Sequence, residues 1–237
     1  MKCYIGTSGW HYEHWKGSFY PQGLPKTAWL EYYTRHFHTV ELNNSFYHLP
    51  SEKAFNHWRI SAPQGFIYSV KVNRLITHLK KLRDCVEPLT NFITRAQLLG
   101  DKLGPLLYQL PPGLKCNAQL LEDFIKILPR GKRHVFEFRD PSWFDEKIFD
   151  ILSHYDCGLC IFDMPDFSSP VMVTCDFAYL RFHGSQSLYG GCYSDDELKS
   201  WADKIRALDV STIYAYFNND AGGFAIQNAL TLKQLLR

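Results

Sequence analysis

The sequence lacks long apolar runs, a strong net charge and a leader-like beginning. No apolar stretch reaches the roughly 18 residues that a membrane span requires, and Met1–Ile5 has neither the basic nor the apolar region of a signal peptide. The formal net charge of +2 is too small to indicate nucleic-acid binding by itself. Seven cysteines, an odd number without a secretory signal, are typical of reduced thiols. We therefore expect a cytoplasmic protein with no membrane partner.

Motifs that indicate a metal or redox centre are also scarce. The chain has no His-Glu-x-x-His sequence, and Cys157 with Cys160 forms its only Cys-x-x-Cys. On a strand these two thiols would point to opposite faces, and a zinc site would need a second pair. His36 and His38 have a ligand-like spacing, but at a predicted helix end, where solvated side chains are the simpler interpretation. Motifs therefore assign no metal ligand and no certain cofactor.

What the sequence does contain is a strand pattern followed by a helix pattern about every 30 residues, the period of βα units. Helices are predicted between most strands, and Ser194 begins a capping box with Glu197. The segment 164–175 contains prolines and no helical period, so a helix is expected to be missing or reduced there. With no linker or composition break, residues 1–237 are predicted to form a single (β/α)8 TIM-type barrel domain of the α/β class. The eight predicted strands lie at residues 3–7, 39–42, 66–72, 104–110, 135–139, 158–162, 177–182 and 212–217.

The fifth predicted strand carries charges among apolar residues. The two-residue period of a strand places Val135, Glu137 and Arg139 on one face and Phe136 and Phe138 on the other. A barrel interior is normally filled with apolar branched side chains, so two charges there need a reason. Glu137 and Arg139 are either a structural ion pair or a catalytic carboxylate beside an anion-binding guanidinium.

Polar residues at the ends of many strands favour a closed barrel over an open sheet. An open α/β sheet binds its ligand where the strand order reverses, so only the strands beside that point need polar residues at their ends. A closed barrel instead brings the ends of all strands to one mouth. Seven of the eight predicted strands end in polar residues, and the first ends in Ser8-Gly9. They are Glu41, Lys71, Gln109, Glu137 with Arg139, Asp163, Arg181 with His183, and Asn218.

Seven motifs along nearly the whole chain carry a family resemblance. They are GTSGWHYEHWKGSFYP (6–21), VELNNSFY (40–47), SVKVNRLITH (69–78), LGPLLYQLPP (103–112), VFEFRDPSW (135–143), YLRFHGS (179–185) and YAYFNNDAGGFAIQNAL (214–230). Through them the chain resembles the YecE-like family, domain of unknown function 72. The resemblance implies a TIM-barrel fold and supplies no reaction. A distant likeness of that family to the barrels of endonuclease IV and xylose isomerase suggests phosphodiester or sugar chemistry by analogy of fold.

The candidate catalytic residues come from the predicted strand ends. Glu41, Glu137 and Asp163 are candidates for acid–base work, because carboxylates with separated pKa values are its usual signature. The same three side chains with His183 could instead hold a divalent metal ion. Lys71 is a candidate base or second cation, because burial lowers the pKa of a lysine. A salt bridge from Lys71 to Glu41 is the alternative.

An anion site is predicted from the loops after strands 7 and 8, which often bind phosphate in TIM barrels. Arg181 could bind phosphate or carboxylate through two parallel hydrogen bonds. Gly222 would allow close backbone approach, unless it only terminates the loop. The other predicted substrate-binding residues are Arg139, Asn43, Gln109, Asn218, Asn219, Trp10 and Tyr47.

Aromatic residues crowd the loops expected at the barrel mouth. They could stack nucleobases or sugar rings, although loop packing is the alternative for each one. They are Trp10, Tyr12, Trp15, Phe46, Tyr47, Tyr189 and Tyr193.

Two functions fit these patterns. The first is an enzyme, either a hydrolase or phosphodiesterase or an isomerase, that acts on a small phosphorylated or otherwise anionic ligand through carboxylate acid–base or metal-assisted chemistry. The second is a nucleic-acid-binding module without turnover, which would use aromatic loops and the basic residues Lys80, Lys81 and Arg83.

Overall fold

Eight parallel strands line the interior of the computed structural model, which describes residues 1–237. Neighbouring strands pair in the order β1-β8-β7-β6-β5-β4-β3-β2. The predicted strand positions are confirmed to within one or two residues at most ends. The strands are β1 (Lys2–Thr7), β2 (Thr39–Leu42), β3 (Ile67–Lys71), β4 (Leu103–Gln109), β5 (His134–Glu137), β6 (Cys157–Asp163), β7 (Phe177–Phe182) and β8 (Thr212–Phe217).

The seam between β1 and β2 is the one place where neighbouring strands are not paired by a backbone ladder. The Tyr33 hydroxyl bridges the two strands instead, accepting from the Thr7 amide at 3.0 Å and donating to the Thr39 carbonyl at 3.1 Å. A Cβ at Gly6 would overlap the Thr39 carbonyl oxygen, so glycine permits the close approach. The result is a nearly closed barrel, which confirms the predicted fold class.

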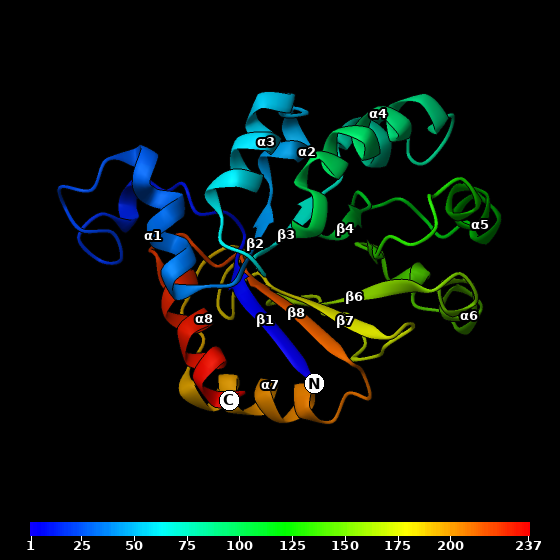
Figure 1. Cartoon of the computed structure of the whole chain (residues 1–237). Helices are drawn as coiled ribbons and strands as arrows, with labels where there is room; N and C mark the ends of the chain where they lie inside the picture. The colour runs from blue at the N-terminus through cyan, green and yellow to red at the C-terminus, as the bar shows by residue number, and fades with distance from the viewer.

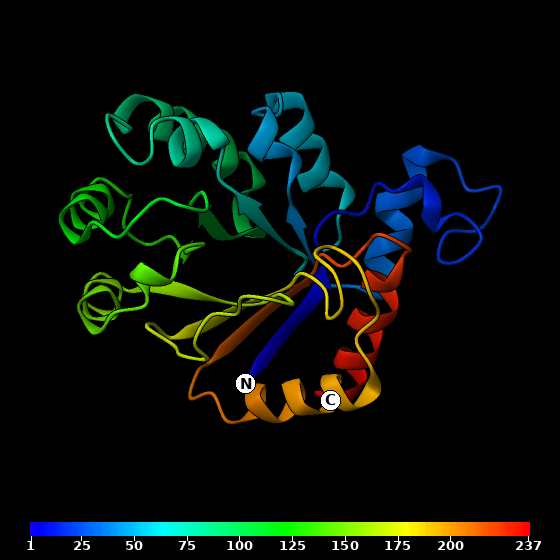
Figure 2. The ribbon, with the colours of Figure 1, turned by 180° about the vertical axis from the view of Figure 1, so that it is seen from behind.

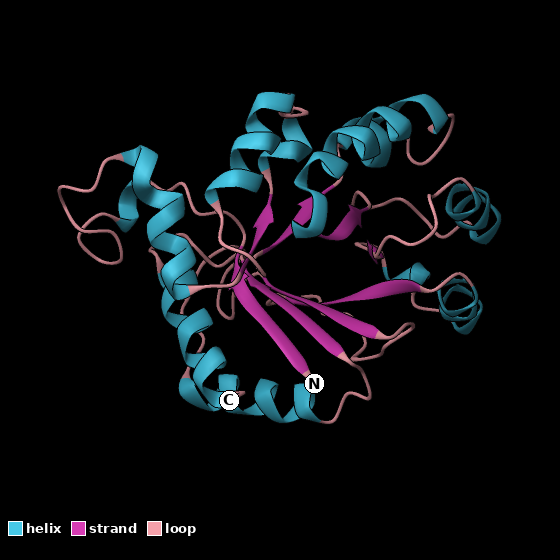
Figure 3. Cartoon of the chain, viewed as in Figure 1, coloured by secondary structure: helices cyan, strands magenta, loops and turns pink.

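Helices form an outer layer around the strands (Figure 1, and by type in Figure 3). No helix follows β6, and the connection to β7 is an extended coil (Figure 2), as its prolines predicted. None of the helices is both long and apolar enough to cross a membrane. They are α1 (Trp29–His36), α2 (Asn44–Tyr47), α3 (Glu52–Ser61), α4 (Val86–Ala96), α5 (Ala118–Lys126), α6 (Glu146–His154), α7 (Asp195–Arg206) and α8 (Phe224–Leu235).

The barrel has two separate apolar cores, one between strands and helices and a smaller one inside the strands. Val135 lies in the inner core, while Phe136 and Phe138 lie in the outer one, so the predicted faces of β5 are confirmed. The capping box at Ser194 and Glu197 is also confirmed at the start of α7. Because Glu137 shares the inward face with Val135, its carboxylate lies at the C-terminal end of the inner core.

Candidate active site

Arg181 of β7 joins two glutamates inside the barrel mouth. Its Nη2 lies 2.8 Å from Glu41 Oε1, and its Nη1 lies 2.7 Å from Glu137 Oε2; the three side chains are fully buried. Glu41 also accepts from the Ser8 hydroxyl at 2.7 Å and from the Tyr179 hydroxyl at 2.6 Å. Buried ions are tolerated when they are paired and hydrogen-bonded in this way. Strands β1, β2, β5 and β7 therefore contribute to one closed hydrogen-bond network.

Arg139 extends this network toward the surface. Its Nε donates to Glu137, and its Nη2 lies 2.8 Å from His183 Nε2. Because arginine only donates, His183 Nε2 is the acceptor and the ring proton is on Nδ1. Asn218 Nδ2 lies 3.2 Å from that Nδ1, and turning the amide over would present its oxygen to the ring proton. His183 is thus held as a neutral ring between Arg139 and Asn218.

Both network glutamates are held ionised. Burial alone raises the pKa of a carboxyl group, but here the Arg181 charge holds the pKa of Glu41 below its usual value. The charges of Arg139 and Arg181 likewise outweigh burial and hold the pKa of Glu137 well below its usual value. The predicted acid–base role for Glu41 and Glu137 does not fit this arrangement. Their carboxylates orient and neutralise the two arginines.

The same pairing argues against the predicted metal site. No three donor atoms of Glu41, Glu137, Asp163 and His183 lie within reach of one ion; such a group occurs only at Asp156, Cys175 and Asp176, on the N-terminal side of the strands. At the mouth, the Asp163 carboxylate instead accepts from the Ser168 hydroxyl at 3.0 Å. The glutamate oxygens face guanidinium groups, which a hard cation would have to displace.

Lys71, at the end of β3, is a partly buried charged group of this mouth without a partner. Its Nζ makes no hydrogen bond or ion pair and lies 4.3 Å from the centre of the Phe46 ring. The predicted alternative of a salt bridge to Glu41 is wrong, because Arg181 occupies that carboxylate. Burial, assisted by the Arg181 charge, lowers the pKa of Lys71 to about 7, although Glu137 and Glu41 partly oppose the change.

Two further polar atoms of the mouth also lack partners. The Oε1 atom of Gln109 is buried without a hydrogen bond, and so is Arg181 Nε. Gln109 pairs in register with Glu137, so its side chain lies in the same inward layer. Buried polar groups normally have partners, and exceptions often mark functional positions.

Arg181 has carboxylates on both of its terminal nitrogens, so the predicted pair of parallel hydrogen bonds to an anion would have to displace one of them, and only its Nε is left without a partner. Asn219 is also structural: its amide donates to the Gly191 carbonyl at 2.9 Å and to Asn228 Oδ1 at 2.8 Å. Gly222 has a φ of +119° and lies in the turn before α8. The loops after β7 and β8 are therefore hydrogen-bonded to each other. These contacts leave no unpaired positive side chain that could bind an anion.

A different group of cations faces the mouth beside β3. Burial and then the positive charges of Lys71, Arg74 and Arg139 lower the pKa of His78 to about 4. Arg74 is exposed and makes no ion pair. Sequence reasoning missed both Arg74 and His78, although they lie in the polar run that directly follows β3.

The mouth aromatics divide into packing and surface groups. Trp15 and Tyr193 are buried, so for them loop packing is the correct interpretation. Tyr47 and Tyr189 are exposed. Trp10 lines a pocket of about 340 Å³ beside the mouth, together with Tyr12, Asn43 and other residues.

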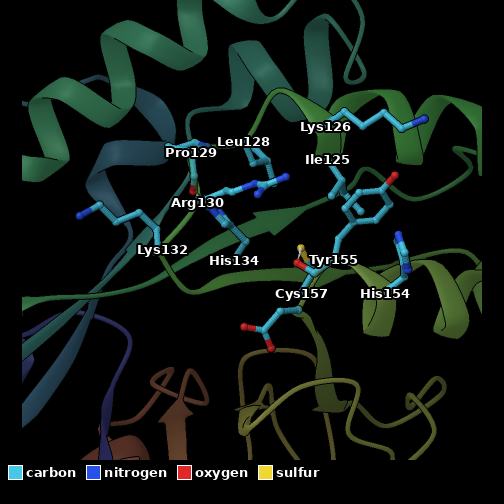
Figure 4. Close-up of a pocket in the computed structure, with 12 residues that line it drawn as sticks. Ile125, Lys126, Leu128, Pro129, Arg130, Lys132, His134, His154, Tyr155 and Cys157 are labelled. Carbon is cyan, nitrogen blue, oxygen red and sulfur yellow. Dashed lines mark hydrogen bonds between the residues drawn. The ribbon is translucent and has the colours of Figure 1, made fainter.

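A larger pocket lies at the opposite end of the barrel. It has a volume of about 480 Å³ and is lined where α5 and α6 end and β5 and β6 begin (Figure 4). His134 at its base already bonds the Pro129 carbonyl at 2.9 Å and the Tyr108 hydroxyl at 3.1 Å. TIM-barrel sites lie at the C-terminal face, so this pocket is not the candidate active site.

A nearly closed parallel barrel with a charged network at its C-terminal mouth defines the chain as a TIM-barrel protein. A family model described as "Protein of unknown function DUF72" matches residues 4–237, and the chain belongs to this family.

Relatives span several bacteria. The crystal structure of a DUF72 family protein from Thermotoga maritima is 31% identical, with a TM-score of 0.91, and the match covers 100% of this chain and 99% of that one. UPF0759 protein YecE of Escherichia coli K12 is 32% identical over 142 residues, 60% of this chain and 50% of YecE. The matched segment therefore spans half the length of that curated relative. UPF0759 protein YunF of Bacillus subtilis is 25% identical over an alignment of 269 positions. That alignment covers 98% of this chain and 94% of YunF.

The neutral state of His183 predicts a loss of stability in acid. Burial, followed by the Arg181 charge, lowers its pKa to about 4 from 6.5. Between these values the unfolded chain binds a proton and the folded chain does not, so the free energy of unfolding falls as the pH falls from 6.5 to 4. This one group accounts for about 3 kcal/mol.

Urea unfolding at pH 7 and at pH 4.5 measures this effect. His183→Gln is expected to show a smaller loss of stability between the two pH values than the wild type. His57→Gln on the exposed face of α3 is the matched control and should change as the wild type does. An unchanged loss in His183→Gln would contradict the assignment.

Proposed function

We propose that the mouth is the active site of an enzyme that acts on a small anionic molecule, phosphorylated or carboxylated, with Lys71 as the group that transfers a proton. The observation that carries this proposal is the unpaired Lys71 amine in a mouth whose other buried charges are paired. A pKa near neutrality lets an amine accept and return a proton under physiological conditions. We still expect a cytoplasmic location, from the cysteine content.

The charge balance supports an anionic ligand. The guanidinium groups of Arg139 and Arg181 are matched by the carboxylates of Glu41 and Glu137. A protonated Lys71 therefore adds a positive charge that no carboxylate of the mouth contacts. Because the charges of Lys71, Arg74 and Arg139 all act on His78, a phosphate or carboxylate would meet a positive potential beside that ring.

A nucleic-acid-binding module is the second candidate, and the exposed residues Lys81 and Arg83 favour it. They follow Arg74 on the same segment after β3, where they could contact a phosphate backbone. Binding through them would have a steep salt dependence. Binding of a small anion in the mouth would depend on salt only weakly.

A thermal-shift panel of nucleotides, sugar phosphates, carboxylic acids and short oligonucleotides tests the proposal. A ligand at about 100 times its Kd adds roughly 2.7 kcal/mol, which is several degrees in Tm. A small phosphorylated or carboxylated molecule is expected to shift the wild type. Arg74→Gln should weaken that ligand about two- to fivefold, because it removes one rim charge, and the matched Arg83→Gln should leave it unchanged.

The reverse pattern would favour the nucleic-acid module. In that case only oligonucleotides would raise Tm, and Arg83→Gln would weaken them more than Arg74→Gln. A panel without any hit would count against a preformed anion site.

A further inference from the structure

Beside the charged mouth lies an uncharged aromatic pocket of about 340 Å³, a size typical of small-molecule sites. No lysine, arginine, aspartate or glutamate lines it. Its walls come from the loops that follow β1 and β2 and from α3. The residues that line it include Gly9, Trp10, Tyr12, Asn43, Asn44 and Trp58.

We propose that this pocket binds the neutral ring of the substrate, a nucleobase or a sugar, while the phosphate of the same molecule lies at Lys71 and Arg74. This inference rests on the proposed function and names its substrate class: a phosphorylated molecule with an uncharged, hydrogen-bonding ring. An anion alone would gain nothing from such a pocket.

The aromatic walls are held rigidly. Trp10 packs edge-to-face on Trp58, with ring centres 5.8 Å apart and planes at 88°. The Tyr12 hydroxyl donates to the Ser8 carbonyl at 2.6 Å, which fixes that ring as well. A preorganised ring surface binds a planar ligand at low entropic cost.

A polar group of matching chemistry lies among these rings. The side-chain amide of Asn43 makes no hydrogen bond within the protein, and its Oδ1 is buried without a partner. An amide both donates and accepts, as the edges of nucleobases and the hydroxyl groups of sugars do. Asn43 was predicted as a substrate-binding residue, and its free amide supports that prediction.

The pocket and the charged mouth are adjacent. The single-turn helix α2 lies between them: Asn44 at its start lines the pocket, and two residues later the centre of the Phe46 ring lies 4.3 Å from Lys71 Nζ. On the other side, Ser8 connects Tyr12 to Glu41 through two hydrogen bonds. These two hydrogen bonds, of 2.6 and 2.7 Å, run from the pocket wall to the charged network, a separation that one small molecule can span.

Isothermal titration calorimetry with adenosine 5′-monophosphate, ribose 5-phosphate, glucose 6-phosphate, adenosine, glucose and inorganic phosphate tests this inference. At least one phosphorylated ring compound is expected to bind about tenfold tighter than inorganic phosphate, the effect of stacking on one aromatic side chain. Trp10→Ala should remove that advantage without weakening inorganic phosphate. Tyr32→Ala, which removes a half-buried ring of α1 outside the pocket, is the matched control and should retain it.

If Trp10→Ala does not fold, Asn43→Leu serves in its place and should lower the affinity for the same ring compound. Preference for adenosine 5′-monophosphate over ribose 5-phosphate would identify a nucleobase, and preference for glucose 6-phosphate would identify a sugar.

Failures of the two proposals can be told apart. Phosphate binding that Arg74→Gln weakens but Trp10→Ala leaves unchanged for every compound would overturn the ring pocket and leave the proposed function standing. Binding of adenosine or glucose that needs Trp10 but is indifferent to phosphate would support the pocket and overturn the proposed function. Absence of binding by all six compounds would overturn the ring pocket, and together with a thermal-shift panel without any hit it would overturn the proposed function as well.

Discussion

Replacing Lys71 by methionine is expected to lower turnover of the identified substrate at least about 100-fold, the usual contribution of a positioned acid or base, while raising Tm. Methionine keeps the apolar length of the side chain and removes its amine. Because burial makes the protonated amine less stable in the folded chain than in the unfolded one, its loss should stabilise the fold near neutral pH. Loss of activity together with a gain in stability distinguishes a functional lysine from a structural one.

Lys71→Arg is the matched variant, because arginine keeps the positive charge but stays protonated in proteins. It should retain much of the affinity for an anionic ligand and still lose turnover. In the wild type, kcat is expected to change with pH around 7, where the amine titrates. This change of kcat with pH should be absent from Lys71→Arg. Turnover above half of the wild-type value in Lys71→Met would refute the assigned role.

Replacing Arg181 by methionine is expected to lower the free energy of unfolding by about 3–5 kcal/mol, the cost of breaking a buried ion pair from one side. The substitution leaves Glu41 without a guanidinium partner and Glu137 with Arg139 alone. Urea unfolding at pH 7 measures the loss. Arg35→Met, which removes an exposed pair with Glu31 at 2.7 Å, is the control and should cost under about 1 kcal/mol.

A second substitution separates charge from packing at Arg181. In Arg181→Met the isolated Glu41 carboxylate is the expected source of the loss, so adding Glu41→Gln should recover part of the stability. The deficit should also narrow in acid, because Glu41 can then become protonated and neutral. An equal deficit in the single and double variants at both pH values would mean that lost packing, rather than unpaired charge, explains the effect.

The sequence by itself determined the order of the elements and the inward face of β5. Side chains of a strand alternate between its two faces, and a capping box joins residues that are three positions apart. These features therefore depend only on neighbours along the chain. That is why the inward position of Glu137, the capping box at Ser194 and the missing helix after β6 could all be predicted correctly.

Only the tertiary structure decided which charges pair. Arg181 contacts Glu137 across 44 residues of sequence and Glu41 across 140, and both contacts depend on where each strand lies around the barrel. The sequence pattern placed Arg181 and Lys71 at the same mouth without distinguishing them. Barrel closure gives both carboxylates to Arg181 and leaves the Lys71 amine unpaired, because the two terminal nitrogens of one guanidinium meet one glutamate each.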